Sequence, residues 1–251
     1  METGTGKRRI PEVDFLRGTA VLMMILFHLV FDLDYFSLCE IDLNSGFWLV
    51  FGYLTAFLFV FIAGMSAWIS RKRAESRLDK KGICMKFLKR GLFIFAIGLG
   101  ITAVTWVFAP ESPIVFGTLH LIGLSIMVAP LFFGFGTKNI YIGLAVVFAG
   151  ILIHDISGSP LLTIIGIHAP GFSTLDYKPV IPWFGYFLAG MAASEYLYPE
   201  GLSRSFSEKI ERYCPDFIRV TGRHSLAIYL VHQPVMIILL SICFGKMLLS
   251  V

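Results

Sequence analysis

Charged residues are scarce in this sequence. Asp, Glu, Lys and Arg together make up 15% of the 251 residues, whereas hydrophobic residues make up 56%, and the mean hydropathy is +0.76. Soluble globular domains carry about 25% charged residues and a smaller apolar share. The composition therefore excludes a soluble globular domain and predicts an integral membrane protein.

The sequence also lacks the cysteine patterns that indicate a metal site. Its four cysteines, at positions 39, 84, 214 and 243, form no CxxC pair and have no histidine arranged beside them. We expect no metal and free thiols, with a disulfide between Cys39 and Cys243 as the alternative. No internal repeat and no inverted pair of broken helices, a feature of many transporters, is visible either.

Seven apolar segments approach the roughly 20 residues that a helix needs to cross a bilayer. They span residues 15–36, 47–69, 91–108, 117–135, 140–156, 180–198 and 225–249. We therefore expect an all-α bundle of about seven transmembrane helices, forming one domain over residues 1–251. Because the first segment carries polar residues within it, we interpret it as a mature helix and not as a signal peptide. Prolines interrupt residues 157–180, so we expect a re-entrant or surface segment there.

Basic residues are distributed unevenly between alternate loops. If the N-terminus is cytoplasmic, all of the 21 Lys and Arg residues except Lys178 and Lys246 fall on the cytoplasmic side. Such an excess of positive charge marks the cytoplasmic face of membrane proteins. We predict a multi-pass protein of the cell membrane with its N-terminus inside and its C-terminus outside.

The first segment carries a polar stripe on one helix face. Eleven helical steps of about 100° bring His28 to within roughly 20° of Arg17, about 16 Å further along the axis. Asp32 follows one turn later on a neighbouring part of that face. An arginine at a helix end can be a snorkelling anchor, and a histidine can serve packing. A histidine deep in a membrane segment, however, favours a functional role, because imidazole exchanges protons near neutral pH.

Two further histidines lie inside the predicted helices. His120 opens the fourth segment, and His232 lies in the last segment, three residues after Tyr229. Pro234 cannot donate a main-chain hydrogen bond and is expected to kink the last helix close to His232. For each of the two histidines, a structural role and a functional role stay open.

The basic loop between the second and third segments has two interpretations. It can be an ordinary positive-inside signal that touches anionic lipid headgroups. Alternatively, its ends can contribute to a cytoplasmic ring of cations that binds phosphates. The arginines of that ring would be Arg17, Arg71, Arg73, Arg90 and Arg223.

Three motifs, in this order, resemble those of a known superfamily. RGTAVLMMILFH at residues 17–28 resembles the R-x10-H signature of the acyltransferase-three membrane enzymes. FLFVFIAGMS at 57–66 resembles their F-F-I-S-G segment, and GRHSLAIYLVHQPV at 222–235 resembles their terminal segment. The whole chain most resembles small prokaryotic members of the heparan-alpha-glucosaminide N-acetyltransferase catalytic-domain family, which belongs to the same superfamily.

The resemblance implies a membrane-embedded, acyl-CoA-dependent O- or N-acyltransferase. It implies acyl-CoA, by default acetyl-CoA, as cytoplasmic co-substrate, a catalytic His28, and Arg17 helping to hold the donor. The acceptor would be an extracytoplasmic hydroxyl or amine, as of a sugar or glycan. The catalytic histidine of the lysosomal enzyme lies after the first helix, where this chain has acidic residues instead. The assignment of His28 therefore follows the R-x10-H enzymes, and the acceptor is not carried over.

A mechanism can be assigned to these residues as a hypothesis. His28 would act as general base or carry the acyl group, and Asp32 would fix the His28 tautomer or position the acceptor, unless it only caps the helix. An oxyanion contact would come from His120, Tyr229 or His232. The expected partners are acyl-CoA, the acceptor and the lipid bilayer, without nucleic acid, and the chain could form a homodimer. A proton-coupled transporter or flippase and a purely structural membrane protein are the alternatives.

Overall fold

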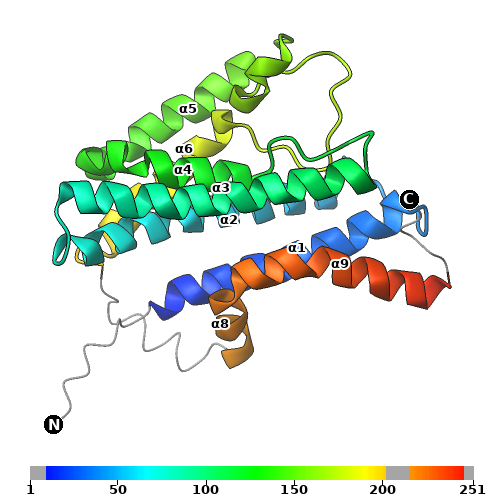
Figure 1. Ribbon diagram of the computed structural model, residues 1–251, viewed down its shortest axis with the longest axis horizontal. Helices are drawn as coiled ribbons and strands as arrows, with labels where there is room; N and C mark the ends of the chain where they lie inside the picture. The colour runs from blue at the N-terminus through cyan, green and yellow to red at the C-terminus, as the bar shows by residue number, and fades with distance from the viewer. Residues whose placement is uncertain (1–9, 202–214, 246–251) are drawn as a thin grey trace. The chain divides into compact units, whose positions relative to one another are not determined.

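The computed structural model describes residues 10–201 and 215–245 (Figure 1). Within these ranges every regular element is a helix, and extended chain pairs only at two isolated bridges. The predicted all-α fold is therefore confirmed for the described part of the chain. The chain divides into two compact units, residues 1–59 with 203–251 and residues 60–202. The single domain expected over residues 1–251 stays a prediction.

The described residues of the first unit form three complete helices and the beginning of a fourth. These are α1 (Pro11–Tyr35), α8 (Asp216–Arg223), α9 (Ser225–Phe244) and the first part of α2 (Gly46–Glu75). Pro11 opens α1, and Glu12 and Asp14 place negative charge in its first turn, where the helix dipole favours it. Figure 1 shows α9 running beside α1, with α8 crossing near the start of α1.

Helices α1 and α8 cross with their main chains in contact. A Cβ on Gly222 would overlap the carbonyl oxygen of Asp14, and a Cβ on Gly18 would overlap the carbonyl oxygen of Ile218. Small residues permit this close approach between membrane helices. We call this contact the glycine crossing. It also positions the beginning of α9, because only His224 lies between the last residue of α8 and the first residue of α9.

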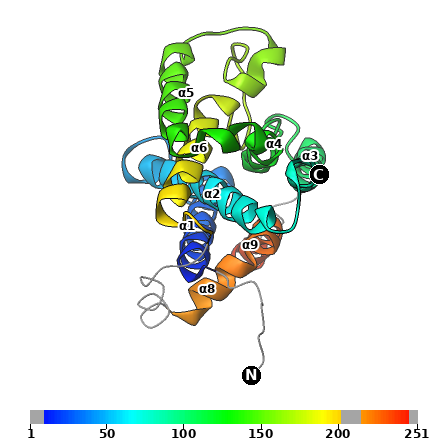
Figure 2. The ribbon, with the colours of Figure 1, turned by 90° about the vertical axis from the view of Figure 1, so that its left-hand side faces the viewer.

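The second unit consists of the rest of α2 with four further helices. These are α3 (Lys80–Phe108), α4 (Thr118–Phe132), α5 (Asn139–Ile153) and α6 (Val180–Leu197). Figure 2 shows α4 beside α3 and α5 beside α6, and these pairs share the most extensive contacts. A short 3-10 helix, η1 (Phe133–Lys138), joins α4 to α5. Gly136 within it has φ +55°, which suits glycine and lets the chain turn.

In the part of the chain that the structure describes, five helical stretches are long and apolar enough to cross a membrane. They are Pro11–Tyr35, Gly46–Glu75, Lys80–Phe108, Thr118–Ile153 and Ser225–Phe244. The fourth stretch joins α4 to α5, which the sequence analysis counts as two crossings, and α6 is not among the five. The stretches support a multi-pass membrane protein. Seven crossings, with the N-terminus inside and the C-terminus outside, stay a prediction.

Residues 157–180 form no long helix, as the prolines predict. They contain one 3-10 helix, η2 (Pro160–Ile165), followed by a stretch in which Tyr177 pairs with Phe116 of the loop before α4. Main-chain hydrogen bonds join the same two loops, including one from Lys178 N to the carbonyl oxygen of Phe116. The segment therefore packs on the beginning of α4, and its predicted re-entry into a membrane stays a prediction.

Candidate functional site

His28 and His232 lie together in the first unit, although the sequence separates them widely. Helix α1 presents His28 and α9 presents His232, with the two ring centroids 4.8 Å apart and the ring planes at 76°. His232 is only 9% exposed, and His28 is half-buried. Of the predicted site residues, these two imidazoles therefore form the central pair, which we call the histidine pair.

Main-chain hydrogen bonds set the tautomer of both rings. His28 Nδ1 lies 2.9 Å from the carbonyl oxygen of Met24, and His232 Nδ1 lies 2.7 Å from that of Tyr229. Because a carbonyl oxygen only accepts, each Nδ1 must carry the proton. In the neutral rings each Nε2 is then a base, and Nε2 of His232 has no hydrogen-bond partner among the described residues.

Asp32 and Gln233 form a second contact between α1 and α9, beside the histidine pair. Gln233 donates from Nε2 to Asp32 Oδ1 at 2.5 Å, and Asp32 is 1% exposed. The His28 tautomer is thus set by the carbonyl of Met24 and not through this carboxylate. Gln233 is not among the site residues predicted from the sequence, although its place directly after His232 is a signal that could have indicated it.

Tyr229 contributes to this site through its main chain as well as its ring. Its carbonyl orients His232, and its ring centroid lies 5.7 Å from that of His232 and 6.0 Å from that of Phe59. Its predicted oxyanion role stays a prediction. Pro234 lies inside α9, which continues to Phe244.

Arg17 and Arg223 share one buried carboxylate at the beginning of α1. Arg17 Nη1 lies 3.0 Å from Asp14 Oδ1, and Arg223 Nε lies 3.7 Å from Asp14 Oδ2. Gly222 lets α8 approach the main chain of Asp14 closely, which brings the neighbouring Arg223 to this place. Asp14 is not among the residues predicted from the sequence, although its spacing of three residues from Arg17 is typical of a helical ion pair. Two guanidinium groups therefore lie close together at the beginning of α1.

The other three predicted donor-binding arginines lie in the second unit. Arg71 stacks on the rings of Trp68 and Phe133, at 4.7 and 5.0 Å, and donates to the carbonyl oxygen of Phe133 at 2.5 Å. Arg73 donates to the carbonyl oxygen of Gly201 at 3.1 Å, and Arg90 is exposed. Arg71 and Arg73 therefore contribute to the packing of this unit. The predicted ring takes residues from both units and stays a prediction.

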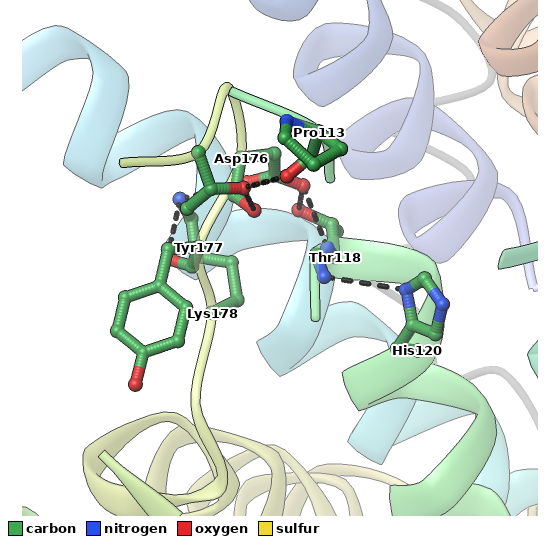
Figure 3. Close-up of polar contacts among 8 residues, drawn as sticks. Pro113, Thr118, His120, Asp176, Tyr177 and Lys178 are labelled. Carbon is green, nitrogen blue, oxygen red and sulfur yellow. Dashed lines mark hydrogen bonds and ion pairs between the residues drawn. The ribbon is translucent and has the colours of Figure 1, made fainter. Parts of the chain in front are cut away.

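His120 is built into the beginning of α4 (Figure 3). Its Nδ1 accepts from Gly117 N at 3.2 Å, so its proton resides on Nε2, which lies 3.2 Å from the hydroxyl of Thr102. That hydroxyl in turn donates to the carbonyl oxygen of Ile114 at 2.6 Å. Both nitrogens of this 2% exposed ring are thus engaged. The geometry indicates a structural histidine.

Asp176 secures the same helix start from the loop before α6 (Figure 3). Its Oδ2 accepts from Thr118 N at 2.7 Å and from Thr118 Oγ1 at 3.0 Å, and its Oδ1 pairs with Lys178 Nζ at 3.0 Å. Burial alone would raise the pKa of this carboxyl. The Lys178 ammonium and the hydrogen bonds from Thr118 outweigh burial and hold the pKa of Asp176 below its ordinary value.

Cysteine and metal chemistry have no assembled site in residues 10–201 and 215–245. No group of three His, Cys, Asp or Glu side chains there could hold a metal ion. Cys39, Cys84 and Cys243 are free and exposed, which agrees with free thiols and contradicts the alternative disulfide between Cys39 and Cys243. Cys214 lies outside the described residues.

Comparison with known proteins gives one finding. We found no match among curated proteins or solved structures. A family model described as heparan-alpha-glucosaminide N-acetyltransferase, catalytic, matches residues 9–234. The match covers most of the chain, from just before α1 to Pro234, and includes the histidine pair and Asp32. The chain therefore belongs to the heparan-alpha-glucosaminide N-acetyltransferase catalytic-domain family.

Proposed function

We propose that this protein transfers an acetyl group from cytoplasmic acetyl-CoA to a hydroxyl or amine of an extracytoplasmic sugar or glycan. The observation that carries the proposal is the histidine pair, in which hydrogen bonds place both protons on Nδ1 and leave Nε2 basic. Membership of an acetyltransferase family supports the transfer chemistry, and the five apolar stretches support a membrane location. We also propose the cell membrane as the location.

The reaction follows from the tautomer of His28. The acceptor's O–H or N–H gives its proton to Nε2 of His28, and the oxygen or nitrogen attacks the thioester carbonyl. The C–S bond then breaks, and the proton moves from His28 to the sulfur of the departing CoA. In the alternative, Nε2 attacks the thioester itself and carries the acetyl group before the acceptor takes it. Trapping of labelled acetyl-histidine after rapid quenching distinguishes the two routes.

The donor end of the site is the arginine pair at the beginning of α1. Arg17 and Arg223 bring two guanidinium groups together at Asp14, and guanidinium groups suit the phosphates of CoA. Along α1 the eleven residues from Arg17 to His28 rise about 16 Å, a distance that the extended pantetheine arm can bridge. We propose that the phosphates bind at this pair while the thioester reaches His28.

The testing experiment measures acetyl-CoA binding and CoA release with purified protein in detergent. The comparison includes wild type, Arg17→Ala, His28→Ala and, as matched control, His154→Ala, which removes an exposed histidine of α5's C-terminal end. We expect Arg17→Ala to weaken binding, His28→Ala to retain binding and lose turnover, and His154→Ala to behave as wild type. Failure of folded wild type to bind acetyl-CoA would overturn the proposal in favour of a proton-coupled transporter.

A further inference from the structure

Two acceptor atoms beside the histidine pair are buried without a partner. Among the described residues, neither Asp32 Oδ2 nor Gln233 Oε1 makes a hydrogen bond. Asp32 is 1% exposed, so its carboxylate cannot turn to bulk water instead. A buried polar atom without a hydrogen bond costs free energy, and a buried carboxylate costs more than an amide. Both atoms can therefore accept hydrogen bonds from a bound group.

The hydrogen bond between Asp32 and Gln233 determines which chemical groups could bind here. The amide of Gln233 uses Nε2 to donate to Asp32 Oδ1, and this hydrogen bond orients Oε1 as an acceptor. The two remaining atoms, Asp32 Oδ2 and Gln233 Oε1, both only accept when the carboxyl is ionised. Their complement is a group that presents at least two N–H or O–H donors, such as a primary amine or two neighbouring hydroxyls.

The place of this pair on the helices relates it to the chemistry. Asp32 follows His28 by one turn of α1, where side chains lie about 6 Å apart, and Gln233 follows His232 directly on α9. A group held by Asp32 and Gln233 would therefore lie within one helical turn of the base. The same two helices thus supply both the base and the two unpaired acceptor atoms.

We propose that Asp32 and Gln233 form the binding subsite for the acceptor and select substrates whose reacting end carries at least two hydrogen-bond donors. This inference rests on the proposed acetyl transfer and adds the residues that distinguish acceptors. The carboxylate accepts from an amine or hydroxyl of the acceptor, and the amide oxygen of Gln233 accepts from the second donor. An acceptor held through donors beside its reacting group presents that group's lone pair to the thioester and its O–H or N–H to Nε2 of His28.

The test uses glucosamine and glucose as probes, because they differ in one amine against one hydroxyl. Asp32→Asn replaces one acceptor oxygen by a donor and removes the charge. We expect it to raise the KM for the better probe by about tenfold to a hundredfold, as for a lost hydrogen bond to a charged group. The Kd of acetyl-CoA should not change. An amine-selective site would lose more with glucosamine, whereas a diol-selective site would lose equally with both.

Two further variants separate binding from packing. Asp34→Asn makes the same change two residues along α1, where Asp34 accepts from Ile41 N, and should leave the KM unchanged. Asp32→Asn with Gln233→Glu keeps a hydrogen bond between the helices and two outward acceptor oxygens, and should restore a lower KM. A merely structural contact would instead lower stability and leave the KM of folded protein as in wild type, which would overturn the subsite.

The outcomes also distinguish this inference from the proposed function. If wild type neither binds acetyl-CoA nor releases CoA, the proposed function fails. If wild type transfers acetyl groups through His28 but Asp32→Asn keeps the KM for both probes, only the subsite fails. Transfer by wild type to neither probe, with His28-dependent CoA release to water, would also overturn the subsite. Asp32 Oδ2 and Gln233 Oε1 would then accept hydrogen bonds from buried water.

Discussion

Buried histidines occur in both units of this protein, in two different settings. At the beginning of α4, the hydrogen bonds of His120 engage both ring nitrogens, and they join the main chain of one loop to a hydroxyl of α3. In the histidine pair, each Nδ1 binds a carbonyl of its own helix, and Nε2 of His232 has no hydrogen-bond partner among the described residues. Burial is similar for His120 and His232, at 2% and 9% exposure. The use of the second nitrogen, more than burial, separates a structural histidine from one that can exchange a proton.

The largest expected effect in this comparison is the loss of catalysis in His28→Ala. Removing a general base typically costs a hundredfold to ten-thousandfold, so we expect acetyl transfer to fall about a thousandfold, or about 4 kcal/mol. The hydrogen bond of His28 goes to a carbonyl within its own helix, so the melting temperature should stay close to that of wild type. Initial rates of CoA release and thermal unfolding in detergent measure the two quantities. Unimpaired transfer would remove the central claim.

His120→Ala should show the opposite pattern. The substitution removes the ring that joins Gly117 to Thr102 and leaves a cavity and unpaired polar groups. We expect a loss of about 3 kcal/mol in the free energy of unfolding, with activity per folded molecule near that of wild type. Denaturant unfolding, together with activity corrected for the folded fraction, checks this. A loss of activity in fully folded His120→Ala would contradict the structural role of His120.

Asp176→Asn should weaken the same helix start by a smaller amount, about 1 to 2 kcal/mol, because the hydrogen bonds to Thr118 lose their charge. Since the folded pKa of Asp176 lies below its ordinary value, its stabilisation is fully present above about pH 4. It is lost as the pH falls through the lower, folded pKa. Stability measured against pH should therefore decline less steeply in acid for Asp176→Asn than for wild type. Parallel curves would contradict this assignment.

The smallest expected effect concerns the arginine pair. Arg223→Ala removes the more exposed of the two cations near Asp14. We expect acetyl-CoA to bind about fivefold more weakly, or about 1 kcal/mol, because such a partly exposed charge is screened by solvent. The difference from wild type should shrink as salt is added. Lys138→Ala, which removes a positive charge at the end of η1, is the matched control and should bind as wild type.

The sequence places candidate residues on helix faces but does not give their contacts. Apolar composition indicates membrane helices, and the helical period places Arg17, His28 and Asp32 on one face. The same period says nothing about which carbonyl a ring nitrogen reaches. The roles of Met24, Asp14 and Gln233 therefore became visible only with coordinates.

The helix boundaries show a similar limit. The segments predicted at 117–135 and 140–156 correspond to α4 and α5, but the 3-10 turn between them depends on the positive φ of Gly136, which hydropathy does not register. For His120, the sequence left a structural role and a functional role both open. The distinction required the distances to Gly117 and Thr102.

The glycine crossing has a consequence for the alignment of the site. The same number of residues separates Gly18 from His28 as separates Gly222 from His232, so the two imidazoles lie at equal chain distances from one point of contact. A single residue inserted into or deleted from α9 between Ser225 and His232 would rotate the second imidazole by about 100° around its helix axis. The glycine crossing is therefore the common contact relative to which α1 positions His28, and α8 with α9 positions His232.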